Sequence, residues 1–152
     1  PFINAGLVPS GYLTETNTNG DTITIPSRGQ GGAGHVGFQN NEFWCGPLCY
    51  RIQSLDSRFS TKYIYYYLKE IQEEIVNLRK VGSIPAINRK DLVLVKIPLI
   101  PIDKQKQIVT ILDKFDALVN DISVGLPAEI SARKSQYEYY RNKLLTFKEY
   151  GK

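Results

Sequence analysis

Short apolar runs alternate with clusters of glycine, asparagine and proline through the first 60 residues. Residues 22–25 place apolar side chains at every second position after the turn sequence Asn19-Gly20, which is typical of a half-buried strand that follows a tight turn. Three further runs predict strands at 36–38, 43–45 and 48–52. Because these strands are short and closely spaced, we expect a curled antiparallel sheet or a partial barrel.

The apolar positions change to helical spacing after residue 60. Ser60 or Thr61 can cap this helix, and we expect Gly82 to end it. One face carries the apolar side chains Ile64, Tyr67, Leu68, Ile71, Ile75 and Leu78. Beyond a polar loop, residues 92–97 form a nearly continuous apolar run, which predicts a central strand of the sheet.

Prolines separate this mixed part from a helical C-terminal part. Pro98 and Pro101 lack the backbone N–H that a regular strand or helix needs, so neither element passes through them. Two helical stretches follow, and we expect a break or kink between them at Gly125 and Pro127. Their apolar positions predict a helix–helix interface made of Ile108, Ile111, Leu112, Phe115, Leu118, Ile122, Ile130, Tyr137, Tyr140 and Leu144. The second stretch has too few apolar side chains to be stable alone, so it must pack on the first helix, on another copy or on a partner.

These patterns predict an α+β protein. A β-rich domain with one or two packed helices occupies residues 1–101, and a long, coiled-coil-forming helical arm occupies residues 102–152. We expect the chain to be a fragment or a processed product, since it starts at Pro1 and contains no methionine. No apolar run approaches the roughly 20 residues of a membrane span, so we expect no membrane contact.

The composition suits one buried core and permits a nucleic-acid partner. The chain is 42% hydrophobic and 22% charged, which is not the composition of a disordered protein. The net charge is +4, and residues 61–101 account for +3 of it. This modest basic excess agrees with binding to a polyanion but does not require it.

Metal and cofactor sites are not indicated. Cys45 and Cys49 stand four positions apart, but a structural zinc site needs four ligands and His35 is the only histidine. We therefore expect two reduced thiols in a cytoplasmic protein. The segment 29–34 fits the pattern GxGxxG, but a strand-like segment follows it where a dinucleotide site needs a helix. We expect no cofactor.

No set of residues predicts catalysis. The single histidine limits acid–base pairs, and there is no Gly-x-Ser-x-Gly turn for a nucleophilic serine. A Cys45–His35 dyad has no flanking signature, and the acidic residues of the first helix fit a solvated face. We predict no catalytic residues.

Two polar loops carry the candidate binding residues. Asn and Gln side chains can read adenine, Arg can read guanine, and Lys contacts phosphate. The loops 28–35 and 79–90, with Lys62 as a phosphate contact, give the candidates Arg28, Gln30, His35, Lys62, Arg79, Lys80, Ser83, Asn88, Arg89 and Lys90. The alternatives are an ordinary solvated loop for 82–90 and a flexible hairpin tip for 28–35.

Several segments in order resemble the specificity subunits of type I restriction-modification systems. They are YIYYYL at 63–68, GSIP at 82–85, LVLVKIPLIP at 92–101, QKQIVTIL at 105–112, DKFD at 113–116, GLPAEI at 125–130 and QYEYYRNKLL at 136–145. Upstream, GDTITIP at 20–26, RG at 28–29 and GHV at 34–36 resemble the target recognition domains of that family. The resemblance covers nearly the whole chain.

The resemblance implies a role in DNA recognition. In that family a target recognition domain precedes a conserved helical region, and two such units form a subunit whose helices pair antiparallel as a spacer. Residues 1–101 would then be a recognition domain that lacks its N-terminal part, and residues 102–152 the conserved spacer region. The implied partners are double-stranded DNA, the modification (methyltransferase) and restriction subunits, and a second copy or half paired through the helices.

Two other classes of function remain as alternatives. One is a helical assembly module with no direct DNA role, which the amphipathic helices alone would also fit. The other is an enzyme in its own right, which needs a catalytic pair that this sequence does not provide.

Overall fold

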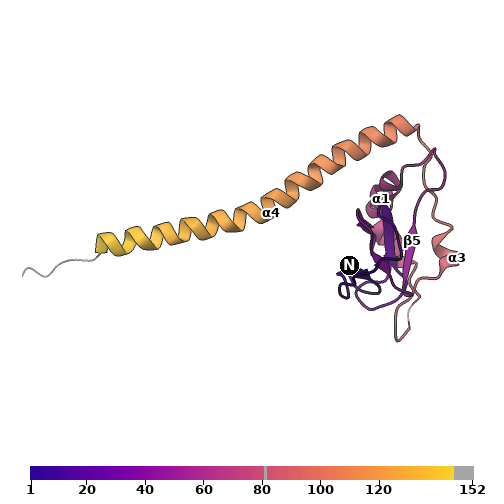
Figure 1. The fold of residues 1–152 in the computed structure, drawn as a ribbon, viewed down its shortest axis with the longest axis horizontal. Coiled ribbons are helices and arrows are strands. Elements are labelled where there is room, and N and C mark those ends of the chain that lie inside the picture. The colour runs from indigo at the N-terminus through magenta and orange to yellow at the C-terminus, as the bar shows by residue number, and fades with distance from the viewer. Residues whose placement is uncertain (81, 146–152) are drawn as a thin grey trace, which may run out of the picture. The chain divides into compact units, whose positions relative to one another are not determined.

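The computed structural model describes residues 1–80 and 82–145, with side chains described except at 119–125, 127, 128, 137 and 140–145. The chain divides into two units, Pro1–Val109 and Thr110–Lys152. The first is a mixed α/β unit, and the second continues the last helix of the chain (Figure 1). The mixed character predicted from the sequence is thereby confirmed.

The sheet of the first unit is built around β2 (Thr22–Pro26). It pairs antiparallel with β3 (Gly37–Gln39) on one side and with β5 (Cys49–Ile52) on the other. All five residues of β2 are buried, because this strand is central and covered on both faces. A separate parallel pair joins β1 (Phe2–Ile3) to β4 (Trp44–Cys45). The four predicted strands are confirmed to within a residue or two.

Two helices cover the sheet. Helix α1 (Thr61–Glu70) begins at Ser60, whose hydroxyl oxygen accepts a hydrogen bond from the Tyr63 N–H at 3.4 Å. Helix α2 (Gln72–Asn77) follows after a one-residue interruption. Their buried faces complete a core made of Ile23, Ile25, Val36, Ile64, Leu68, Ile75 and Ile87. The predicted helix and its serine cap are confirmed.

The predicted end of this helix at Gly82 is wrong. Helix α2 ends at Asn77, five positions earlier. The Lys80 N–H donates to the Ala86 carbonyl at 2.8 Å, so the backbone leaves the helix to pair with a later segment. A tertiary backbone pairing therefore ends the helix before the glycine is reached.

The predicted central strand at 92–97 is also wrong. Helix α3 (Arg89–Leu92) occupies its start, and the N–H groups of Val93, Leu94 and Val95 bond to carbonyls three or four residues earlier. These local hydrogen bonds use the N–H groups that a strand would donate to a neighbouring strand. Leu92 and Val95 pack against the core while Val93 and Leu94 are 67% and 74% exposed, so the run covers the core from outside.

Helix α4 (Ile102–Leu145) is continuous through Gly125 and Pro127. The break predicted there is wrong. An interior proline costs a helix about 3 kcal/mol and a glycine about 1 kcal/mol. Helix-favouring residues on both sides, such as Ala117 and Leu118 before and Ala128 and Glu129 after, outweigh that cost. Among the described helices, none combines the length and the apolar character that crossing a bilayer requires.

Candidate functional site

Two polar loops that are distant in the sequence meet at Ala86. The backbone of Ala86 forms antiparallel bridges with both Arg28 and Lys80. The Gly29 N–H donates to the Pro85 carbonyl at 3.1 Å, and Lys80 and Ala86 exchange bonds of 2.8 and 3.4 Å. Bridged backbones lie about 5 Å apart. The loops 28–35 and 79–90 therefore form one surface, which we call the bridged-loop surface.

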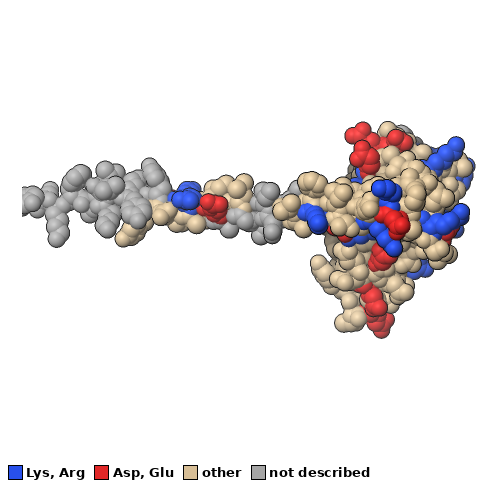
Figure 2. Space-filling view, turned by 90° about the horizontal axis from the view of Figure 1, so that it is seen from above, with Lys and Arg blue, Asp and Glu red and all other residues tan. Residues whose placement is uncertain are grey.

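Most candidate residues of the bridged-loop surface are open to solvent. The exposed ones are Arg28, Gln30, Lys80, Ser83, Arg89 and Lys90. Their cations and amide are the groups that contact phosphates and base edges in nucleic-acid complexes. Figure 2 shows Lys and Arg side chains interspersed with Asp and Glu on one face of the globular unit.

Two further candidates on these loops are partly engaged by the protein. Arg79 donates its Nε–H to the Val76 carbonyl at 2.8 Å, and Asn88 donates its Nδ2–H to Asp91 Oδ2 at 3.1 Å. Both residues are half-buried. Their remaining polar atoms stay available to a ligand, but these contacts also position the loop.

His35 is held by helix α2. The Gln72 Oε1 atom accepts from the Val36 N–H at 3.1 Å and from Lys69 Nζ at 3.3 Å, so the amide turns its Nε2–H towards His35 Nδ1, 3.1 Å away. We therefore assign an unprotonated Nδ1. Burial, with the nearby Lys69 cation, lowers the pKa of His35 below its ordinary value of 6.5. His35 is neutral at pH 7 and connects the loop to the helix.

The glycine-rich loop is packed rather than free. Gly32, Ala33 and Gly34 are buried. Gly34 has a φ of +81°, and a Cβ there would lie 2.7 Å from Ile87 Cδ1, so only glycine fits. The loop joins the antiparallel strands β2 and β3, as the hairpin interpretation of 28–35 expects. Its residues 32–34 are packed against the protein, whereas Arg28, Gln30 and Gly31 reach solvent.

Lys62 lies outside the bridged-loop surface. It sits in the first turn of α1, with its Nζ over the Phe38 ring at 5.6 Å from the ring centre. This cation–π contact holds the ammonium group on the β3 side of the sheet. A phosphate contact by Lys62 stays a prediction, separate from the contacts proposed for the bridged-loop surface.

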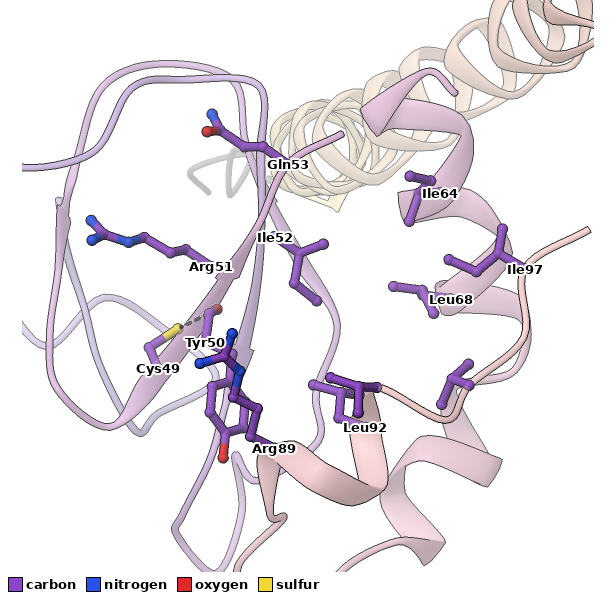
Figure 3. A pocket seen from close by; sticks show the side chains of 12 residues that line it. Cys49, Tyr50, Arg51, Ile52, Gln53, Ile64, Leu68, Arg89, Leu92 and Ile97 are labelled. Carbon is purple, nitrogen blue, oxygen red and sulfur yellow. Dashed lines mark hydrogen bonds between the residues drawn. The ribbon is translucent and has the colours of Figure 1, made fainter. Parts of the chain in front are cut away.

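A cleft of about 680 Å³ lies between β5, α1 and the segment that begins with α3 (Figure 3). Ile52 points towards Ile64 and Leu68, whereas Arg51 points to the other side of β5. Arg89 lines the same cleft, which places one candidate binding residue at the edge of an apolar hollow. Sequence reasoning missed this cleft, because residues 92–97 were assigned to the sheet and not to a cover over it.

Helix α4 carries an exposed apolar stripe. Within the first unit Ile108 is 38% exposed. Within the second unit Leu112 is half-buried, and the exposed members are Ile111, Phe115, Leu118 and Ile130. The predicted interface residues Ile122, Tyr137, Tyr140 and Leu144 lie outside the described side chains. Large apolar side chains at helical spacing on one face are typical of helices that pair with another helix.

Residues 1–132 match the family of the type I restriction modification DNA specificity domain. The chain belongs to this family. The resemblance drawn from the sequence segments is thus confirmed.

Relatives of this specificity domain extend well beyond it. The chain is 47% identical over 88 residues to the type I restriction enzyme EcoR124I/EcoR124II specificity subunit of Escherichia coli, covering 57% of this chain and 22% of the relative. It is 31% identical over 145 residues to the putative type I specificity subunit S.MpnORF285P of Mycoplasma pneumoniae, covering 95% and 46%. The chain spans less than half of either relative.

Solved structures support the same fold for the specificity domain. The S subunit of a type I restriction-modification system from M. genitalium superposes with a TM-score of 0.72 at 29% identity, over 93% of this chain and 37% of that one. A chain of another type I system, at 22% identity, shares the fold with a TM-score of 0.64.

Within residues 1–80 and 82–145, no cluster of three or more His, Cys, Asp or Glu side chains is placed to hold a metal ion. The candidate binding groups of the domain are those of the bridged-loop surface, and the assignment of individual residues to DNA stays a prediction.

Proposed function

We propose that this specificity domain recognises one half of a bipartite double-stranded DNA target for a type I restriction-modification enzyme. The observation that carries the proposal is the bridging of Arg28 and Lys80 through Ala86, which gathers exposed cations and amides from two loops. A reading surface needs several such groups at fixed spacing, and the backbone bridges supply that spacing.

The chemistry of the bridged-loop surface suggests a division of roles. Arg28 and Arg89 present guanidinium groups that can bind guanine O6 and N7 together, and Gln30 can pair with adenine. Lys80 and Lys90 suit phosphate contacts, which add affinity without sequence preference. Base contacts then select the sequence, and phosphate contacts fix the register.

We further propose that helix α4 docks the modification and restriction subunits and pairs with a second specificity half. The apolar stripe through Ile111, Phe115 and Leu118 supports pairing, because a helix with these side chains exposed gains stability by burying them. Two copies related by a two-fold axis would read a palindromic bipartite target. The pairing makes the helices a coiled coil, which sets the distance between half-sites.

The proposal assigns no catalysis and no cofactor to this domain, and places it in the cytoplasm, where free thiols such as those of Cys45 and Cys49 persist. Incubating the chain with S-adenosylmethionine and target DNA should give no methylation. Methyl transfer by the chain alone would contradict the assignment.

Salt-dependent binding to duplex DNA tests the function. The target is first selected from a random library with the assembled methyltransferase. Arg89→Ala should then weaken binding to that target by about 1–3 kcal/mol if Arg89 reads a base, with little change on random DNA. If it contacts phosphate only, binding should weaken alike on all sequences, with a shallower salt slope.

Lys104→Ala is the matched control, since Lys104 is an exposed cation at the start of α4 whose Nζ lies 3.3 Å from Gln107 Oε1. It should leave DNA binding unchanged. Equal affinities for wild type and Arg89→Ala on every sequence would remove this loop from the reading surface. Absence of any salt-dependent duplex binding by the assembled complex would favour the alternative of a pure assembly module.

A further inference from the structure

A pair of neighbouring thiols lies outside the bridged-loop surface. Cys45 ends β4 and Cys49 begins β5. The Cys49 thiol donates to the Tyr50 carbonyl at 3.4 Å (Figure 3). Cys45 Sγ also lies 3.5 Å from the Cys49 carbonyl oxygen. Both cysteines are free and half-buried, so small solutes reach them while the sulfurs remain neighbours.

The turn between the two cysteines is fixed from both sides. Asn17 holds the Cys45 backbone twice, since its Oδ1 accepts from the Cys45 N–H at 2.7 Å and its Nδ2 donates to the Cys45 carbonyl at 3.1 Å. The Leu48 N–H donates to Asn4 Oδ1 at 3.0 Å, and the Leu48 carbonyl accepts from the Ser27 N–H at 2.8 Å and hydroxyl at 3.0 Å. These bonds fix the backbone of the turn that carries both cysteines.

The space around the turn also prevents its rearrangement. A Cβ at Gly46 would lie 2.6 Å from Asn4 Oδ1, and the Gly46 N–H donates to the Ile3 carbonyl at 2.8 Å. The turn therefore packs tightly on the β1 segment. Because the turn is already ordered, forming a disulfide between Cys45 and Cys49 would cost little conformational entropy.

The two sulfurs differ in acidity. The hydrogen bond from Cys49 lowers the pKa of Cys45 to about 7, against the opposing effect of burial and with help from the Arg51 cation. The same hydrogen bond, together with burial, raises the pKa of Cys49. Arg51 is itself held in place, because its guanidinium donates to the Asn17 carbonyl at 3.3 Å and to the Thr18 hydroxyl oxygen at 3.0 Å. Cys45 is thus the nucleophile and Cys49 the proton-bearing neighbour.

We propose that Cys45 and Cys49 form an oxidation site at which a hydroperoxide converts the thiol pair into an intramolecular disulfide. The Cys45 thiolate attacks one peroxide oxygen, an S–O bond forms, the O–O bond breaks, and the leaving hydroxide takes up a proton to become water. The Cys49 sulfur then attacks the Cys45 sulfur, which forms the S–S bond. The S–O bond breaks, and the hydroxide leaves with the Cys49 proton as a second water. The two sulfurs lose two electrons and the peroxide gains them.

The oxidation site is independent of DNA recognition, because none of its groups belongs to the bridged-loop surface. It does adjoin the cleft of Figure 3, since Cys49 lines that cleft together with Arg89. A structural thiol pair with no reactivity is the competing explanation of the same contacts. The two explanations differ in reaction rate and in product.

The test is oxidation of the full chain by hydrogen peroxide after removal of reductant, followed by intact mass measurement. We expect the mass to fall by two hydrogen atoms, peptide mapping to join Cys45 to Cys49, and dithiothreitol to restore the thiols. The rate should rise with pH through a midpoint of about 7. Oxygen addition without a disulfide, disulfides only between chains, or a midpoint at the ordinary thiol value of 9.0 would overturn the proposal.

Three variants assign the roles. Cys45→Ser should slow peroxide consumption at least about tenfold, because burial alone still raises the pKa of the remaining Cys49 thiol above its ordinary value. Cys49→Ser should react at Cys45 and stop at a sulfenic acid that dimedone traps. Arg51→Gln should slow the reaction at pH 7 and recover at higher pH. Equal rates in wild type and Cys45→Ser would contradict Cys45 as the nucleophile, and a trappable sulfenic acid on Cys49 would reverse the roles.

Discussion

Gln105 connects the start of helix α4 to the rest of the first unit, Pro1–Val109, and its removal should destabilise that unit strongly. Its side chain is fully buried and makes three hydrogen bonds. Its Oε1 accepts from the Ser60 N–H at 2.9 Å, and its Nε2 donates to the Arg58 carbonyl at 2.7 Å and the Ile100 carbonyl at 2.8 Å. One amide thus joins the beginning of α1, the loop before it and the beginning of α4.

The Gln105→Ala variant leaves one N–H and two carbonyls without these partners. Each buried polar group that loses its partner costs roughly 1–3 kcal/mol, and water that enters the vacated space brings each cost towards the lower end. We therefore expect a loss of about 3–5 kcal/mol, which is a large part of the 5–15 kcal/mol that stabilises a typical domain. Urea unfolding followed by the fluorescence of Trp44, the single tryptophan, measures it.

Two comparison variants sharpen the test. Gln105→Glu keeps the acceptor for Ser60 but sets a buried carboxylate against two carbonyls, which raises its pKa in the folded state. Its stability should therefore be highest at acid pH and should fall as the pH rises through that raised pKa. Gln107→Ala removes an exposed amide two positions later and should change stability by less than about 0.5 kcal/mol. Equal stabilities of Gln105→Ala and Gln107→Ala would show that the buried amide of Gln105 does not stabilise the first unit.

Three further predictions concern the cap, the histidine and the arm. Ser60→Ala removes the acceptor for the Tyr63 N–H and should destabilise the unit by about 1 kcal/mol in the same urea assay, whereas Ser60→Asp, which keeps an acceptor, should not. Stability should fall as the pH drops from the ordinary histidine pKa of 6.5 towards the lowered pKa of His35. In that range the unfolded chain binds a proton at His35 and the folded chain does not. A His35→Gln variant with the same pH profile would disprove this cause. Phe115→Asp on the apolar stripe of α4 should reduce self-association measured by light scattering. Lys114→Asp beside it should not. A wild-type chain that stays monomeric at high micromolar concentration would contradict pairing through α4.

The local elements were predictable because their signals are local. Alternation over residues 22–25 gave β2, and helical spacing after Ser60 gave α1. The strand predicted at 92–97 was wrong because a continuous apolar run fits a buried strand and a segment that covers the core equally well. Only the local turns after Arg89, in which the N–H groups of Val93, Leu94 and Val95 bond to nearby carbonyls, distinguish them.

The candidate residues could be named from the sequence, but the meeting of their two loops could not. Arg28 and Lys80 are polar loop residues in the sequence, yet their meeting at Ala86 joins positions about 50 apart. Gln105 lies in the polar segment QKQ and reads as an exposed helical residue. Gln105 is buried because it hydrogen-bonds to the Ser60 N–H and to two carbonyls, and these groups come together only in the folded chain.

Photo-crosslinking tests most directly whether the bridged loops read DNA together. A benzophenone amino acid replaces Gln30 in one loop and Ser83 in the other, both exposed, and the assembled enzyme is irradiated on its selected target. The same replacement at exposed Ser57, outside both loops, is the control. We expect crosslinks from Gln30 and Ser83 to bases of the same half-site and none from Ser57. Crosslinks from neither loop, or from the two loops to different half-sites, would contradict this expectation.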